Sequence, residues 1–142
     1  MIKEYKDEYL DIIMKTIKCS KGNEMVNEEI LKNTLFYEKD DDIAMISFEK
    51  FGRNALIRYF IFRKSIEYHI VLELMEALIE KAKENNIINL IAISSNEMKN
   101  LFLDLKFKEF DKTYFFIGEL NILNTRYKNA NIMICNLCNH LD

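Results

Sequence analysis

Apolar side chains recur every three to four positions between residues 66 and 82, in the stretch IEYHIVLELMEALIEKA. Steps of four residues connect the central stripe, whose members are Ile66, Ile70, Leu74, Leu78 and Ala82. Val71, Met75 and Ile79 widen this stripe. The pattern predicts a long amphipathic helix with one buried face, ending at Asn85 and Asn86.

Shorter apolar runs on either side of this helix predict strands. Residues 43–51 and 54–62 are rich in strand-forming side chains, and Gly52 with the two residues after it predicts a hairpin turn between them. The run ALIRYFIF alternates too little for a half-exposed strand, so we expect it to be buried on both faces near the centre of a sheet. INLIAIS, residues 88–94, predicts a short buried strand after the helix.

The N-terminal third of the chain predicts a strand and two helices. We expect the strand at residues 2–5 and the helices at residues 7–18 and 27–36, with Asp7 and Asn27 as their caps. The polar stretches CSKGNEMVN and EKDDD predict a loop between the helices and a turn after them.

The C-terminal third predicts one more helix and two more strands. The helix covers residues 95–107 and begins at Ser95 or Asn96, and the strands cover residues 109–120 and 129–137. These elements predict the mixed α/β (α+β) class, with one central, mostly antiparallel sheet flanked by about four helices. No linker-like segment divides the chain, so we expect a single domain over residues 1–142. The last strand could also pair with another chain, which is our ground for a homodimer.

Charge and composition exclude several classes of partner. The 23 acidic and 20 basic residues are mixed along the chain and give a net charge of −3, so no basic stripe is present for nucleic acid. The apolar runs are far shorter than the roughly 20 residues of a membrane span. The N-terminus also lacks the apolar core of a signal peptide, so we expect a cytoplasmic protein that binds neither nucleic acid nor membrane.

The three cysteines are expected to be reduced thiols without a metal. Cys135, Cys138 and His140 have a spacing that occurs in zinc sites when a fourth ligand is present. No second Cys/His cluster supplies that ligand, and burial in a strand explains Cys135.

The order of the elements and the register of residues 55–110, from ALIRYFIF through NLFLDLKFKEF, resemble the GNAT superfamily of N-acetyltransferases. Asn96 falls on the Asn that often opens the last helix of that family, and Phe107 matches the Phe of the Gly-Phe pair that ends it. The segment ANIMICNL is similar to the closing strand of the ribosomal-protein-acetylating branch. The resemblance implies an acetyl-CoA-dependent N-acetyltransferase with a GNAT-like fold.

The resemblance also implies a position for acetyl-CoA. In the family, the turn Arg/Gln-x-x-Gly-x-Gly/Ala presents backbone amides to the pyrophosphate, and the helix register places this motif on residues 66–71. The implied cofactor-binding residues are Phe60, Ile61 and Phe62 for the pantetheine, Glu67, Tyr68, His69, Ile70 and Val71 for the pyrophosphate, and Asn96.

The motif differs from the family pattern at several positions. His69 and Val71 occupy the positions of its two small residues, so side chains stand where backbone would approach phosphate. Glu67 adds a like charge beside the anion, whereas Arg63 and Lys64 could supply cationic contacts.

No catalytic acid or base can be assigned by resemblance. Phe102 stands where relatives have a Tyr that protonates the CoA thiolate, and the positions matching their strand Glu are Ala55 and Ile57. Tyr68 and Tyr114 are alternative acids and His69 an alternative base or phosphate ligand, although aromatic packing or a surface position explains each without a ligand. The catalytic residues therefore stay unknown.

Two functions from different classes remain open. One is transfer of an acetyl group to a primary amine of a small molecule or a protein, in which the acetyl-CoA is a co-substrate. The other is a non-catalytic GNAT-like module that binds a protein or a different ligand. An unrelated α/β binding domain is a third reading, which requires the register match to be accidental.

Overall fold

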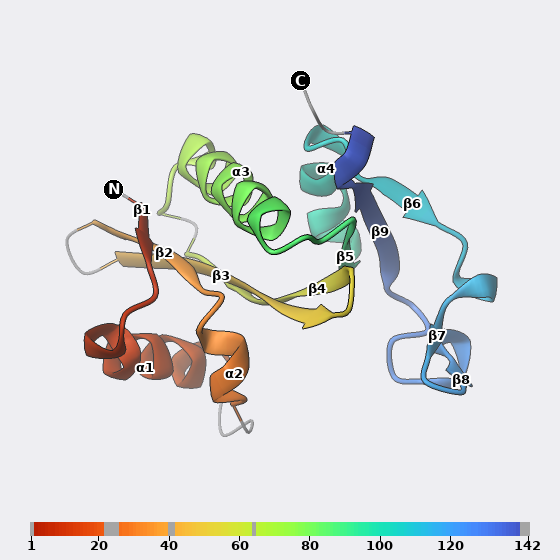
Figure 1. Cartoon of the computed structure of the whole chain (residues 1–142), viewed down its shortest axis with the longest axis horizontal. Coiled ribbons are helices and arrows are strands. Elements are labelled where there is room, and N and C mark those ends of the chain that lie inside the picture. Colours follow the sequence, from red (N-terminus) through yellow and green to blue (C-terminus); the bar gives the residue numbers. More distant parts are fainter. Residues whose placement is uncertain (1, 22–25, 40–41, 64, 140–142) are drawn as a thin grey trace.

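A seven-stranded sheet forms the centre of the fold in the part of the chain that the structure describes, residues 2–21, 26–39, 42–63 and 65–139 (Figure 1). The structure is a computed structural model. Across the sheet the strands are β1 (Ile2–Glu4), β2 (Leu35–Lys39), β3 (Asp42–Phe51), β4 (Asn54–Ile61), β5 (Asn89–Ser94), β9 (Asn131–Asn136) and β6 (Lys108–Phe110). β4 and β5 are parallel, and every other neighbouring pair is antiparallel.

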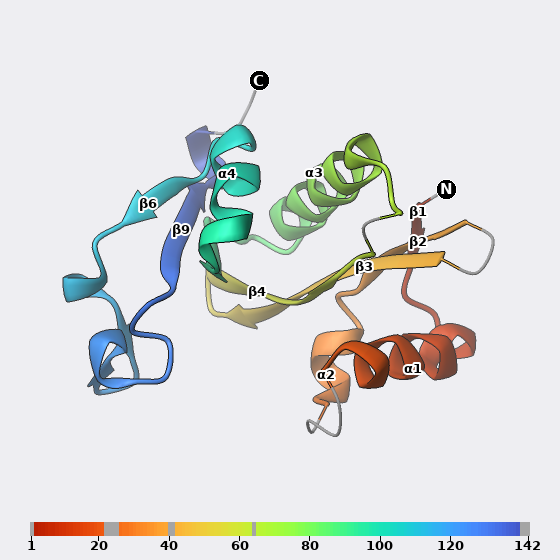
Figure 2. The same cartoon turned by 180° about the vertical axis from the view of Figure 1, so that it is seen from behind.

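Helices cover both faces of this sheet. They are α1 (Leu10–Lys21), α2 (Glu28–Leu31), α3 (Tyr68–Glu84) and α4 (Asn96–Asp104). α1 and α2 lie on one face, and α3 and α4 lie on the other (Figures 1 and 2). The predicted class, a mixed and mostly antiparallel sheet with about four helices, is therefore confirmed.

Single 3-10 turns and a small hairpin complete the described residues. The turns are Asp7–Tyr9, Lys112–Tyr114, Ile122–Asn124 and Leu137–Asn139, and the hairpin strands are β7 (Phe116–Ile117) and β8 (Leu120–Asn121). None of the helices in the described residues combines the length and the apolarity needed to span a bilayer.

The long helix predicted from the apolar stripe is confirmed as α3. It begins at Tyr68 rather than Ile66, but Ile66 is still buried beneath its first turn. Leu74, Met75 and Leu78 expose no surface, and each contributes about 2 kcal/mol by leaving water. The stripe thus fixes which side of α3 faces the sheet.

β4 occupies the middle of the sheet, as predicted, and contains a β-bulge. Met45 of β3 pairs with Ile61, and Ser47 pairs with Arg58, so three steps along β4 oppose two along β3. Tyr59 lies within the bulge with a left-handed φ of 52°, which is unfavourable for a bulky aromatic residue.

The bulge exchanges the two faces of β4. Ala55 and Ile57 pack into the core beneath α3 and α4, and after the bulge Phe60 and Phe62 do so. Tyr59 instead packs into the smaller core beneath α1. The weak alternation of ALIRYFIF therefore comes from this change of register, and the expected burial on both faces is only partial: Ala55 is buried, Arg58 is exposed and the other six residues are partly buried.

Strand β2 was not predicted, and the helix expected over residues 27–36 was too long. The observed helix in this region is α2, which has only four residues. Leu35 and Phe36 are both buried but pack into different cores on opposite faces of β2, so their adjacency imitated a helical stripe. Asn27 is confirmed as a cap, because its side chain accepts from the amide two residues later at 2.9 Å.

The ends of the first helix also differ from the prediction. Asp7 does not cap it, because Asp7 lies inside the 3-10 turn and its carboxylate accepts from the Tyr5 hydroxyl at 3.2 Å. Helix α1 continues through Lys21, so Cys19 is helical rather than in a loop. The rest of that predicted loop around Gly22 lies outside the described residues, apart from its final two positions.

The strand predicted over residues 109–120 is wrong as a single element. β6 ends at Phe110, and the Asp111 carboxylate then accepts from the Thr113 amide at 2.9 Å, which starts a 3-10 turn. Hydrogen bonds from the backbone amide and the side chain of Thr113 lower the pKa of the Asp111 carboxyl group. The chain turns back again at Gly118, whose φ of 64° suits the hairpin of β7 and β8.

The last predicted strand is confirmed as β9, but it does not lie at an edge of the sheet where another chain could pair with it. β9 lies between β5 and β6 and is paired on both sides. It offers no free edge, so the ground given above for a homodimer is wrong.

Candidate functional site

The seam between β4 and β5 opens after only three residue pairs, the last of which joins Leu56 to Ile91. β3 still pairs with β4 as far as Ile61, and β9 pairs with β5 as far as Ser94. The two parallel strands are therefore held from outside while they separate from each other. Backbone groups on the inner edges of β4 and β5 face this opening, since no further pair joins these strands in the described residues.

Aromatic rings from β4 and α4 line the α3–α4 side of the opening. Phe60 lies 5.2 Å from Phe62 and 6.2 Å from Phe102, and Phe102 lies 5.1 Å from Phe107, measured between ring centroids. Phe102, the residue at the position of the family's Tyr, is buried in this cluster. The cluster can hold an apolar chain, but it presents no proton donor.

The first turn of α3 lies beyond the end of β4 and has amides available for an anion. The amides of Ile70 and Val71 already donate to the Glu67 carbonyl, at 3.0 and 3.4 Å. Those of Tyr68 and His69 have no partner among the described residues. The five-residue stretch predicted for the pyrophosphate therefore has few free amides, although the positive end of the helix dipole remains.

Charged side chains surround this helix terminus. One oxygen of the exposed Glu67 carboxylate lies 3.1 Å from His69 Nδ1, and the other lies 3.8 Å from the Lys39 ammonium of β2. Lys39 was not identified from the sequence. Arg63 is exposed nearby, and Lys64 lies outside the described residues. The like charge expected from Glu67 is thus present, and the Lys39 ammonium partly offsets it.

A hydrogen bond joins the start of α3 to the end of α4. The Tyr68 hydroxyl donates to the Asp104 carboxylate at 2.9 Å, and this bond, with a smaller contribution from desolvation, raises the pKa of Tyr68. Together with the contact between Phe60 and Phe102, it links the β4–α3 side of the opening to α4. Tyr68 was considered as a substitute acid, but its proton is engaged here and is held more tightly than usual.

Polar groups gather where β5 ends and α4 begins. The Asn96 side-chain oxygen accepts from the Asn131 amide of β9 at 2.8 Å, which fixes the residue predicted to contact the cofactor. Ser94, one residue before the cap of α4, is buried and its hydroxyl has no partner among the described residues. The sequence carried a signal for Ser94, because it continues the buried alternation of Leu90 and Ala92 with a polar side chain.

The remaining candidate groups do not converge on the opening. Ala55 and Ile57, at the positions of the family's strand Glu, are apolar and cannot act as a base. Tyr114 lies on the 3-10 turn after β6, and 72% of its surface is exposed. Cys135 is buried, which raises the pKa of its thiol, and Cys138 is exposed. His140 lies outside the described residues, and within them no group of three or more His, Cys, Asp or Glu side chains could hold a metal.

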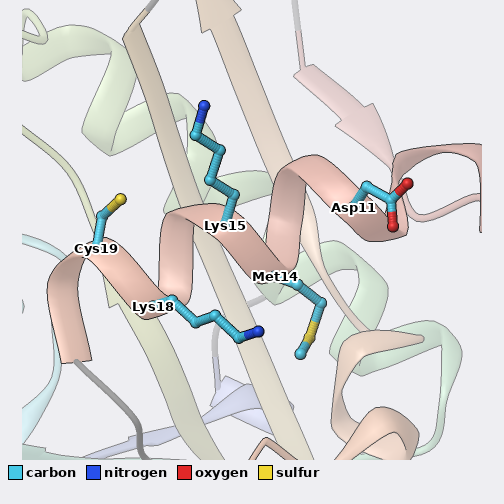
Figure 3. A pocket seen from close by; sticks show the side chains of 5 residues that line it. All are labelled: Asp11, Met14, Lys15, Lys18 and Cys19. Atoms are coloured by element: carbon cyan, nitrogen blue, oxygen red, sulfur yellow. The ribbon is translucent and has the colours of Figure 1, made fainter.

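Two hollows are lined by other residues than those predicted for the cofactor. The first lies along α1, and Figure 3 shows that its lining side chains all come from this one helix and point in different directions: Asp11, Met14, Lys15, Lys18 and Cys19. The second is an open groove of about 930 Å³ between the sheet and the chain after β6, with Ile91 and Ile134 among its lining residues. Neither hollow contains the residues predicted for the cofactor.

Comparison with solved structures identifies the fold. The N-acetylglutamate synthase from Neisseria gonorrhoeae complexed with coenzyme A and L-arginine matches with a TM-score of 0.73 and 15% identity, over 96% of this chain and 32% of that one. Rv2747 from Mycobacterium tuberculosis, in complex with CoA, also gives 0.73, with 10% identity over 96% and 98% of the two chains. An acetyltransferase of the GNAT family from Staphylococcus aureus Mu50 gives 0.64, with 15% identity over 96% and 98%.

The chain spans about a third of the length of the gonococcal synthase, but nearly the whole length of the other two proteins. Neither a family model nor a curated protein sequence matches it. At these identities the structural likeness defines the fold alone. The resemblance first seen in the sequence is therefore confirmed at that level: this chain has the fold of the GNAT acetyltransferases.

Proposed function

We propose that this protein is a divergent GNAT-type N-acetyltransferase that binds acetyl-CoA in the opening between β4 and β5 and transfers the acetyl group to a primary amine. The observation that carries the proposal is the separation of two parallel strands after Leu56 and Ile91 within this fold. Structural neighbours that were crystallised with coenzyme A support the same class of ligand.

The cofactor would run from the bulge of β4 to the first turn of α3. Backbone groups of Phe60, Ile61 and Phe62 would hold the pantetheine, and Asn96 would contact it from α4. The pyrophosphate would meet the amides of Tyr68 and His69, which have no partner among the described residues. The amides of Ile70 and Val71 contribute through the helix dipole only, because they already have a partner.

The chemistry would depend on positioning. The neutral amine attacks the thioester carbonyl directly, the C–N bond forms and the C–S bond breaks, the thiolate leaves with the bonding electrons, and the surplus proton of the amine nitrogen passes to solvent water. Holding two reactants together can contribute more than the roughly 10² to 10⁴-fold that a general acid or base adds. An acetyltransferase without a side-chain acid would therefore be slow rather than inactive.

A non-catalytic binding module is the second candidate. Phe102 cannot protonate a thiolate, and Glu67 repels an anion at the α3 terminus. The bond between Tyr68 and Asp104 also spans the route that the cofactor would take. These contacts favour a module that keeps the fold and binds a partner or a ligand other than acetyl-CoA.

Calorimetric titration with acetyl-CoA and CoA, combined with thermal unfolding, tests the proposal. A ligand of the native state must raise the unfolding temperature, so we expect both ligands to bind and to stabilise the protein. If neither ligand binds at millimolar concentration, the proposal of an acetyltransferase is overturned. Given binding, assays with a panel of small amines and peptide N-termini separate transfer from simple retention.

Substitution of Glu67 gives a matched pair of variants. Glu67→Gln removes the like charge beside the predicted pyrophosphate, so CoA should bind several-fold more tightly, most clearly at low salt. Glu76→Gln removes an equally exposed carboxylate farther along α3 and should leave affinity unchanged. Equal effects of the two variants would mean that the anion does not bind at this terminus.

We also propose an acceptor class and an assembly state. We favour an amine of a small molecule or of a protein, and single-domain behaviour of the chain in the cytoplasm. A homodimer, if formed, would use a surface other than β9.

A further inference from the structure

Ser94 at the end of β5 is buried without a hydrogen-bond partner. Only 5% of its surface is exposed. Among the buried side-chain polar atoms of the described residues, its hydroxyl oxygen is the one that has no partner. A buried hydroxyl with no partner destabilises a folded chain, so a group that binds it is expected from elsewhere.

Another buried serine of this sheet, in contrast, has a hydrogen-bond partner for its hydroxyl. Ser47 on β3 exposes no surface, and its hydroxyl lies 2.6 Å from the Thr34 hydroxyl, with which it shares a hydrogen bond. Both serines lie on strands of the same sheet and both are covered. The difference is that Ser47 pairs with Arg58 across the β3–β4 seam, whereas Ser94 lies beyond the last pair of β4 and β5.

The position of Ser94 explains what could reach it. Ser94 lies three residues past Ile91, which forms the last pair with β4. It shares a face of β5 with Leu90 and Ala92, both in the core that also contains Phe102. Ser94 therefore lines the α3–α4 side of the opening, next to the aromatic cluster.

Two polar side chains beside Ser94 are tied to each other. Asn131, directly opposite Ser94 on β9, donates its side-chain amide to the Asn96 side-chain oxygen at 2.8 Å. Within the described residues, the Ser94 hydroxyl is thus the buried side-chain polar group at this end of the opening that has no partner.

We infer that the Ser94 hydroxyl is a positioning residue for the ligand in this opening, and that it hydrogen-bonds to an amide or thioester carbonyl of an acyl-pantetheine chain. The inference rests on the proposed function, since it assumes that such a chain enters between β4 and β5. The hydroxyl is the donor and the carbonyl oxygen is the acceptor. No covalent step is involved, because the serine orients the chain and does not react with it.

This role predicts opposite effects on stability and on binding. Ser94→Ala removes a hydroxyl that has no partner in the free protein, so its unfolding temperature should stay equal or rise. The same change should weaken acetyl-CoA binding about tenfold, as expected for one buried hydrogen bond of about 1.4 kcal/mol. Ser94→Thr keeps a hydroxyl and should retain most of the affinity.

Ser47→Ala provides the matched control. It removes a hydroxyl of the same kind from the same sheet but leaves Thr34 without its partner, so it should lower the unfolding temperature. Acetyl-CoA affinity, measured below that temperature, should be unchanged, because Ser47 lies on the paired seam.

Calorimetry with acetyl-CoA on the full chain and its three variants decides the matter. If the wild type binds and Ser94→Ala binds equally well, the role of Ser94 is refuted while the proposed function stands. If Ser94→Ala destabilises the free protein as much as Ser47→Ala, Ser94 is structural and the inference also falls. If the wild type does not bind acetyl-CoA at millimolar concentration, both the proposed function and this inference are overturned.

Discussion

The two seams beside β4 are built in opposite ways. On one side, β3 and β4 pair from the hairpin to Ile61 apart from the bulge, and the buried Ser47 hydroxyl of β3 shares a hydrogen bond with Thr34, the residue before β2. On the other side, β4 and β5 separate after three pairs and leave Ser94 without a partner. Among the described residues, the two seams thus differ both in the length of their backbone pairing and in whether the buried hydroxyl beside them has a partner.

The largest expected difference concerns buried aromatic rings at the two seams. Phe48 on β3 exposes no surface, so Phe48→Ala should cost about 3–5 kcal/mol through lost burial and a cavity that cannot collapse. Phe102 faces the opening beside the partly exposed Phe60, so Phe102→Ala should cost less, about 3 kcal/mol. Urea unfolding measures both, and equal losses would show that the second seam is as tightly packed as the first.

The next effect concerns the hydroxyl pair that joins Ser47 of β3 to Thr34, the residue before β2. Ser47→Ala should destabilise the protein by about 1–3 kcal/mol, because the buried Thr34 hydroxyl loses its partner. Adding Thr34→Val should recover part of this loss, since both polar groups are then gone. A double variant that is less stable than Ser47→Ala would contradict this account of the pair.

A smaller effect of the opposite sign is expected at the end of α4. Lys106 has a left-handed φ of 69°, at the position where the GNAT pattern has Gly. Lys106→Gly should therefore stabilise the protein by up to about 1 kcal/mol, as strain relief exceeds the entropy cost. Asn86 has a similar φ of 63° after α3, and Asn86→Gly should gain less because Asn tolerates this conformation. Thermal unfolding of both variants checks the order.

The smallest effect concerns the bond between Tyr68 and Asp104. Asp104→Asn should lower the pKa of Tyr68 toward its ordinary value of about 10, because the carboxylate acceptor is the main cause of the shift. Folded Tyr68 holds its proton more tightly than the unfolded chain does. The contribution to stability is therefore present below about pH 10 and is lost as the pH rises through the folded pKa.

Ultraviolet titration of the wild type and Tyr68→Phe isolates the signal of this tyrosine. An unchanged Tyr68 titration in Asp104→Asn would show that the bond does not form in solution. If the bond forms, acetyl-CoA should break it on binding along α4, and the titration of Tyr68 should then shift with ligand.

The elements that the sequence predicted well are those whose period is unambiguous. α3 has a stripe several turns long, and the hairpin of β3 and β4 has strand formers on both sides of Gly52. β2 was missed because Leu35 and Phe36 serve different cores, a fact that depends on what lies above and below the strand. The strand predicted over residues 109–120 failed because the Asp111 side chain forms a local turn that competes with extended backbone.

The site could be predicted only in outline. Register with the family placed the candidate residues at the end of β4, in the first turn of α3 and at the start of α4, since each placement follows from neighbouring elements in the chain, and their binding of a cofactor stays a prediction. The contacts that decide its chemistry join distant residues: Tyr68 with Asp104 across α3 and α4, and Glu67 with Lys39 of β2. No local pattern encodes such pairs, whereas Ser94 could have been found from its place in the alternation of β5.

The edges of the sheet carry a consequence for how copies of the protein meet. Both outermost strands, β1 and β6, are only three residues long, and each carries charged side chains, among them Lys3, Glu4, Lys108 and Glu109. Short and charged borders make poor templates for a strand from another molecule. The seven-stranded sheet therefore resists extension at both of its borders, whereas the separate hairpin of β7 and β8, whose strands pair only with each other among the described residues, has no such border strand.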